Sequence, residues 1–179
     1  MIRIARSTLV LVLLPLACDA RAQCDRWQQR VEYTMEVSLD HRDHLFQGTT
    51  RLRYTNNSPD TLREVFFHLY FNAFQPGSEM DVRSRTIEDP DERVGGRIAE
   101  LEAHQVGLSV VSDFEQDGRS AELTPMGTVL KVALARPLLP KRSTTFTFSF
   151  NGQVPVQIRR SGRDNAEEVA YSMTQWYPK

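Results

Sequence analysis

Apolar and polar residues alternate along much of this chain with a period of two, the repeat of a β-strand. The clearest case is residues 31–39, where every second residue is apolar, and this predicts a strand with one face against a core. Residues 44–55 and 62–71 repeat the pattern, with a polar turn at residues 56–60 between them. Phenylalanines alternate with hydroxyl residues in 143–152, which predicts a further core strand.

Two of these strands carry finer predictions. Gly48 interrupts the second stretch, and we expect a β-bulge or a bend there. Residues 62–71 are apolar on both faces, which is typical of a strand that is covered on both sides in the middle of a sandwich.

The remaining pattern predicts strands at residues 104–111, 128–135 and 169–178. Residues 81–100 are polar and charged and contain Pro90 and two glycines, so we expect a loop with at most a helical turn. Seven or eight strands without a convincing amphipathic helix predict an all-β fold, an antiparallel β-sandwich, formed as one domain by residues 23–179.

The N-terminus has the three parts of a secretory signal peptide. Arg3 and Arg6 precede a short apolar stretch at residues 8–17, and Ala20-Arg21-Ala22 matches a signal-peptidase site. We therefore predict a signal peptide at residues 1–22 and a periplasmic or secreted protein. The apolar stretch is about half the length of a membrane span, which argues against an anchor. Lipidation at Cys18 is the alternative, disfavoured by Pro15 where a leucine is preferred.

Composition narrows the function further. The chain has 22 basic and 23 acidic residues, and this balance gives no reason to expect binding to nucleic acid or to an anionic membrane. No apolar segment after the signal is long enough to span a bilayer. After cleavage only Cys24 of the two cysteines remains, so no internal disulfide is possible.

Residues with catalytic or metal-binding chemistry form no complete set. His41 and His44 lie in a turn without a third ligand nearby, and we interpret them as solvated. His68, between Phe66 and Tyr70, is interpreted as a packed, hydrogen-bonded core histidine. The acidic residues at 89–92 and the arginines at 159–163 are interpreted as solvated loops. No zinc-binding HExxH, nucleophile elbow, phosphate loop or CxxC motif occurs, so we predict no catalytic or metal-ligating residue in this chain.

Three stretches together nevertheless resemble a known family. The stretch "YTMEVSLDHRDHLFQGTTRLRYTNNSPDTLREVFFHLYFNAF", the phenylalanine strand that ends at Asn151-Gly152, and "YSMTQWYPK" are similar to the N-terminal β domain of aminopeptidase N-type zinc metallopeptidases, in their bacterial exported branch. The matching residues of the first stretch are Leu45, Gly48, Tyr54, Asn56, Asn57, Ser58, Leu62, His68, Leu69, Tyr70, Asn72, Ala73 and Phe74. The resemblance runs from Tyr33 to the last residue, without residues 81–100.

The resemblance implies a saddle-like β domain that is cut before its end, with Trp176 and Tyr177 lacking their neighbours. In the family, a separate catalytic domain holds zinc through two histidines and a glutamate, and zinc is therefore expected in a full-length relative and not in this chain. By match, Gln175 lies in the segment that lines the pocket for the substrate's first residue, where its amide oxygen would accept from an α-ammonium. The alternative is a strand residue bonded to its neighbours. Trp176-Tyr177 replaces an acidic residue of better-known aminopeptidases, which puts aminopeptidase specificity in doubt.

Three functions follow for testing. The first is a substrate-capping domain of an exported zinc metallopeptidase, inactive alone, that meets peptide substrates through the catalytic domain. The second is a free-standing periplasmic β-sandwich that binds protein or carbohydrate without chemistry. The third, an enzyme of another class, is the weakest because no nucleophile–base pair or ligand set is visible.

Overall fold

The computed structural model describes residues 26–87 and 94–179. The predicted signal peptide, both cysteines and the acidic residues at 89–92 lie outside these ranges. The described chain is mostly antiparallel β-structure, arranged in a five-stranded sheet, a three-stranded sheet and a small two-stranded ribbon. The predicted all-β class is therefore confirmed.

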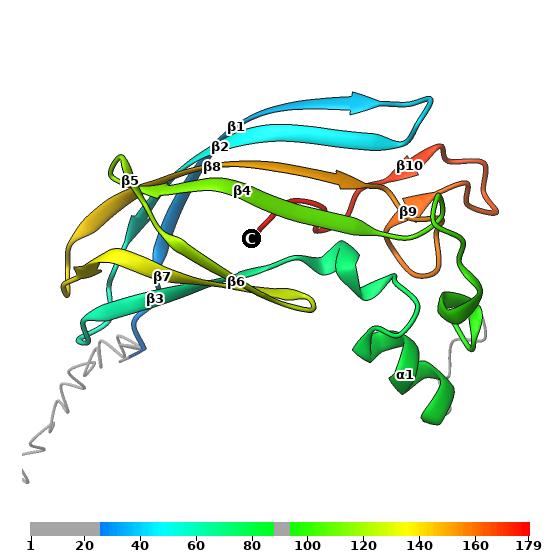
Figure 1. Cartoon of the computed structure of the whole chain (residues 1–179), viewed down its shortest axis with the longest axis horizontal. Helices are drawn as coiled ribbons and strands as arrows, with labels where there is room; N and C mark the ends of the chain where they lie inside the picture. The colour runs from blue at the N-terminus through cyan, green and yellow to red at the C-terminus, as the bar shows by residue number, and fades with distance from the viewer. Residues whose placement is uncertain (1–25, 88–93) are drawn as a thin grey trace, which may run out of the picture.

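The larger sheet forms the upper layer in Figure 1. Its strand order is β1 (Arg30–Asp40), β2 (Leu45–Thr55), β8 (Ser143–Gln153), β4 (Leu108–Gln116) and β5 (Arg119–Ser120). The β1–β2 hairpin pairs along its whole length, and β8 pairs in turn with β2 and β4. The strands predicted at residues 31–39, 44–55 and 143–152 are thus present.

The smaller sheet lies below the larger one and closes the core from the other side (Figure 1). It contains β3 (Leu62–His68), β7 (Val129–Leu138) and β6 (Glu122–Met126), in that order. A ribbon of β9 (Gly162–Arg163) and β10 (Tyr171–Ser172) stands at the far end of the larger sheet. β5 and β6 were not predicted, because their short sequences do not alternate cleanly.

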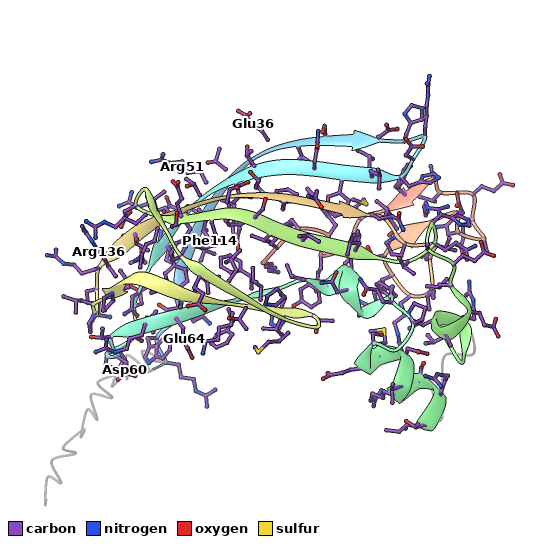
Figure 2. All side chains as sticks on the ribbon, in the orientation of Figure 1. Glu36, Arg51, Asp60, Glu64, Phe114 and Arg136 are labelled. Carbon is purple, nitrogen blue, oxygen red and sulfur yellow. The ribbon has the colours of Figure 1, made fainter. Side chains whose placement is uncertain are left out.

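A cluster of phenylalanine rings joins the two sheets. Phe67 of β3 lies 5.6 Å from Phe114 and 5.5 Å from Phe148, measured between ring centroids, and Phe114 stacks on Phe148 at 5.3 Å. Figure 2 labels Phe114 in the space between the layers. All these rings are buried, so the alternating phenylalanines of β8 face the core as their spacing predicts.

Gly48 and Gly152 are required by close contacts across the larger sheet. A Cβ at Gly48 would lie 2.7 Å from the Phe150 ring, and one at Gly152 would lie 2.4 Å from the Phe46 ring. The register of β2 runs through Gly48 without a shift on both sides. The prediction of a bulge or bend at Gly48 is therefore wrong, because the glycine instead makes room for an aromatic ring.

The predicted strand at residues 62–71 ends early and is covered on one face only. β3 stops at His68, and Tyr70–Ala73 form a 3₁₀ helix, η1. The Asn72 amide explains the change, because it accepts from the backbone N–H of Ser109 at 2.7 Å and donates to the Ser109 carbonyl at 3.1 Å. β3 is also an edge strand, and Phe66 on its outer face is 52% exposed.

A polar helix, α1 (Glu79–Thr86), occupies part of the predicted loop at residues 81–100, followed by the 3₁₀ helix η2 (Arg97–Glu100). Ser78 caps α1 through its hydroxyl, and Arg85 pairs with Asp81 at 2.9 Å. The hydrogen bond from Arg85 holds the pKa of the Asp81 carboxyl below its usual value. The helix has no continuous apolar stripe, which is why periodicity missed it. No helix in residues 26–87 and 94–179 is long and apolar enough to cross a membrane.

The C-terminal segment is an irregular chain packed into the open side of the sandwich, and not the predicted strand at residues 169–178. Within this segment the one assigned strand is β10, which ends at Ser172. Further along, Gln175 has a left-handed backbone with φ of 53°, which does not fit a strand. Trp176 packs against the Phe46 and Phe150 rings at 5.8 and 6.0 Å, and Tyr177 packs against Tyr33 at 5.5 Å. The expectation that this aromatic pair lacks neighbours is wrong.

Candidate functional site

A cavity of about 380 Å³ lies where the C-terminal segment meets η1 and α1, and we call it the Gln175 cavity. Its wall combines aromatic and aliphatic side chains with two arginines, a hydroxyl pair and one amide. The lining residues are Tyr70, Phe71, Ala73, Phe74, Met80, Arg159, Arg160, Ser161, Thr174 and Gln175. A mainly apolar concave wall with a few polar groups is typical of a site for a small organic ligand.

Local hydrogen bonds hold both walls of the cavity. On the η1 side, Gln75 donates from its amide to the Gly107 carbonyl at 2.8 Å, and a Cβ at Gly107 would lie 2.2 Å from the Phe71 carbonyl oxygen. On the opposite side, the Ser161 hydroxyl donates to the Ser172 carbonyl and accepts from the Thr174 N–H, each at 3.0 Å. The cavity is therefore built from segments that the fold fixes.

Gln175 lies at the edge of this cavity with its side chain exposed. Its φ of 53° is uncommon for a residue with a Cβ and directs the chain out of an extended path. No residue in the described part of the chain hydrogen-bonds to the Gln175 amide. Gln175 therefore lies outside the strands, with its side chain exposed.

The backbone at Lys179 ties the end of the segment to the smaller sheet. The His68 N–H donates to the Lys179 carbonyl at 2.7 Å, and the Lys179 N–H donates to the His68 carbonyl at 3.2 Å. This reciprocal pair is the pattern of two antiparallel strands. Together with Trp176 in the core, it fixes Gln175 from the C-terminal side.

The histidines do not form a metal site. His44 Nδ1 lies 2.7 Å from the Tyr171 hydroxyl, which also lies 3.2 Å from the His41 carbonyl oxygen. His68 is exposed and stacks on Tyr70 at 5.0 Å, so its interpretation as a buried core residue is wrong. In residues 26–87 and 94–179 no group of three or more histidine, cysteine, aspartate or glutamate residues is placed to hold a metal ion.

The arginine group at residues 159–163 divides between two roles. Arg163 is buried in β9, donates to the His104 carbonyl at 2.8 Å and pairs with Asp164. It ties β9 to the backbone at His104 and is not the solvated loop residue that the sequence suggests. Arg159 and Arg160 line the cavity and bring positive charge to it.

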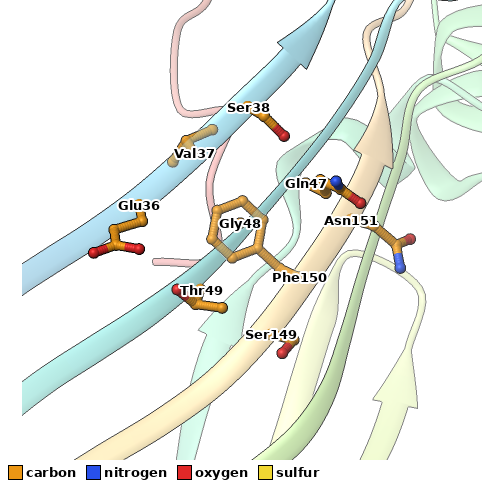
Figure 3. Close-up of a pocket in the computed structure, with 9 residues that line it drawn as sticks. All are labelled: Glu36, Val37, Ser38, Gln47, Gly48, Thr49, Ser149, Phe150 and Asn151. Atoms are coloured by element: carbon orange, nitrogen blue, oxygen red, sulfur yellow. The ribbon is translucent and has the colours of Figure 1, made fainter.

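A second hollow, of about 480 Å³, opens on the outer face of the larger sheet over β1, β2 and β8 (Figure 3). Hydroxyl and amide side chains form most of its rim, and among its lining residues Glu36 carries the one ionisable group. It has no gathered set of reactive or ligating residues. The Gln175 cavity is the stronger candidate because it combines an apolar wall, positive charge and a free amide.

Comparison with known proteins gives structural neighbours and no sequence relatives. No protein-family model matches the chain, and no curated protein matches it. Among solved structures, it is similar to an M1 zinc metallopeptidase from Deinococcus radiodurans, with 14% identity and a TM-score of 0.49, over 82% of this chain and 26% of that one. A two-domain M1 zinc metallopeptidase bound to L-tryptophan gives 14% identity and a TM-score of 0.48, over 83% and 27%. The chain thus spans about a quarter of the length of these proteins.

Zinc, which the sequence resemblance implies for a full-length relative, does not fit the residues described here. A catalytic zinc ion needs three protein ligands close together, and no such set exists in residues 26–87 and 94–179. The residues that line the Gln175 cavity include no histidine, cysteine, aspartate or glutamate.

Proposed function

We propose that this chain is the substrate-capping β domain of an exported zinc metallopeptidase of the aminopeptidase N type, and that it acts with a catalytic domain that is not part of the sequence described. In this role the domain binds peptide and the catalytic domain supplies zinc. The two partners meet the substrate from opposite sides.

One observation carries this proposal. The end of one stretch that resembles the family, residues 68–74, and the last stretch, residues 175–179, are far apart in sequence but adjacent in space. Tyr70, Phe71, Ala73 and Phe74 share the cavity wall with Gln175, and His68 pairs with Lys179 through the backbone. These residues were chosen by sequence resemblance alone, and their meeting at one cavity supports the proposal.

Gln175 is the residue that would hold the substrate's first residue. Its exposed amide oxygen can accept from an α-ammonium, and the apolar wall formed by Phe71, Phe74 and Met80 suits an apolar side chain. Hydrogen bonds to charged groups contribute about 1.5–3 kcal/mol, so loss of this one would weaken binding by roughly ten-fold or more.

Two experiments test the proposal. Reading the gene beyond the codon for Lys179 should reveal an HExxH motif about one domain further on. Fusing the chain to the HExxH domain of such a peptidase should then give hydrolysis of aminoacyl reporters that a chelator abolishes. In that fusion Gln175→Ala should raise KM about ten-fold, whereas Gln47→Ala on β2 should leave it unchanged. Equal KM values in the two variants would show that Gln175 does not bind the substrate.

The second candidate is a non-catalytic exported β-sandwich that binds its ligand unaided. The packing of Trp176 and Tyr177 inside this chain favours it, because a self-sufficient domain covers its own aromatic side chains. A single sharp thermal transition in the isolated chain supports this candidate. Strong binding of a hydrophobic dye to the native chain supports the capping domain, whose apolar surface awaits a partner.

A further inference from the structure

β1 forms a long unpaired edge of the larger sheet. In the part of the chain that the structure describes, its one strand neighbour is β2, and the opposite edge is open over eleven residues (Figure 1). Its inward-facing Val31, Val37 and Leu39 are 42–46% exposed, whereas inward-facing Phe46 and Leu52 of β2 are buried. The apolar face of the sheet therefore continues to an edge that is covered only in part, because Tyr33 packs against Tyr177 whereas Val31, Val37 and Leu39 stay exposed.

This edge lacks three of the features that normally keep strand edges apart: proline, a bulge and inward-pointing charge. β1 contains no proline, and its register with β2 runs without a bulge. Its charged side chains lie on the outer face, where Figure 2 labels Glu36, and none points inward. Long, regular edges without such protection pair with another strand.

We propose that two copies of this chain dimerise by antiparallel pairing of β1 with β1, about a two-fold axis at Met35. Each strand then meets its own sequence reversed. Apolar residues face apolar residues, with Val31 opposite Leu39 of the second copy and Tyr33 opposite Val37. Antiparallel geometry provides about ten backbone hydrogen bonds over this length, as many as a typical specific protein interface contains.

The charged residues of β1 favour this register over the two in which the axis is shifted by one residue. With the axis at Met35, Arg30 faces Asp40 of the second copy, while Glu32 and Glu36 face Ser38 and Thr34. An axis one residue earlier places Glu32 opposite Glu36. An axis one residue later places Glu36 opposite itself. Like charges directly opposite destabilise a strand pair, so the register at Met35 is preferred.

Thr34 allows a test in both directions, because it is exposed on the outer face and would lie opposite Glu36 of the second copy. Thr34→Glu introduces two like-charge pairs by symmetry and should raise the dimer Kd on the order of ten-fold, and Thr34→Lys should lower it by a similar factor. The contact with Arg51 on β2 lies within one chain and is the same in monomer and dimer. Gln47→Glu, one strand further in, is the control with equal charge change and should leave the Kd unchanged.

Sedimentation velocity of the purified protein over a range of concentrations measures these Kd values. Disulfide cross-linking then reads the register, with Cys18 and Cys24 replaced by serine. Met35→Cys should cross-link rapidly because it faces itself, and Val37→Cys should not because it faces Tyr33. A monomer up to about 1 mM, the concentration of a weak Kd, would overturn the proposal. So would equal shifts from the two Thr34 variants, or cross-linking of Val37→Cys as fast as Met35→Cys.

Discussion

Asn56 tests most directly how the turn after β2 stabilises the fold. The residue is fully buried, and its amide joins two turns. Nδ2 donates to the carbonyl oxygens of Asp60 at 2.7 Å and Leu138 at 3.1 Å. Oδ1 accepts from the Ser58 N–H at 3.0 Å and from the Ser58 hydroxyl at 2.6 Å. Gln29 Nε2 also donates to Oδ1, at 3.3 Å. Asn56→Ala removes all five bonds and leaves the Leu138 carbonyl without this donor.

The size of the effect follows from these contacts. A hydrogen bond contributes about 1 kcal/mol net, so the four shorter bonds alone predict a loss of roughly 3–4 kcal/mol in the free energy of unfolding. For a chain of this length that corresponds to a decrease in Tm of about 10 °C. Asn56→Asp should be at least as harmful at neutral pH, because a carboxylate would face two carbonyl oxygens. The Asn56→Asp variant should regain stability as pH falls, because burial favours the protonated form of the new carboxyl group.

Asn57 provides the matched control. It is the same residue type in the same turn, but its amide donates a single exposed bond to the Gln28 carbonyl at 2.8 Å. Asn57→Ala should therefore cost less than about 1 kcal/mol. Urea unfolding of both alanine variants measures the difference, with circular dichroism to confirm the native fold. If Asn56→Ala is no more destabilising than Asn57→Ala, the amide does not hold the two turns together.

Three further predictions concern the core. Gly152→Ala places a Cβ 2.1 Å from the Leu108 carbonyl oxygen and should cost about 3 kcal/mol in thermal unfolding, while Gly96→Ala, with open space around it, should be neutral. Trp176→Ala should cost roughly 2–3 kcal/mol by the same assay, and an unchanged Tm would mean that the segment does not pack in solution. Burial, with a smaller effect of Tyr177, raises the pKa of Tyr33 to about 12. Because the neutral phenol is favoured in the folded state, stability should fall as pH rises from about 10 towards 12, and an ordinary phenol titration by absorbance would contradict this burial.

Three strands of the larger sheet, β1, β2 and β8, were predictable because their alternation of apolar and polar residues can be seen within each segment. One buried and one solvated face gives strict alternation, so β1, β2 and β8 were visible from residues such as Tyr33 and Phe148. The fine detail at Gly48 was not, since the sequence does not reveal which ring approaches it.

The errors have a common origin in tertiary contacts. β3 ends at His68 because Asn72 binds the backbone of Ser109, a residue far along the chain. The C-terminal segment leaves the extended form because Trp176 finds a place between Phe46 and Phe150. Gln175 was named from the family resemblance, but the cavity beside it depends on segments whose convergence no local pattern encodes.

The position of β8 between β2 and β4 sets the order in which the chain can fold. β8 pairs Gln153 with Leu45 and Ser143 with Thr55, so the centre of the larger sheet joins segments that are synthesised far apart. The β1–β2 hairpin can form early, but it must wait for β8 before its aromatic face is covered. Chains dominated by such non-local pairing fold in milliseconds to seconds, and during that delay the hairpin is the region most exposed to misassembly.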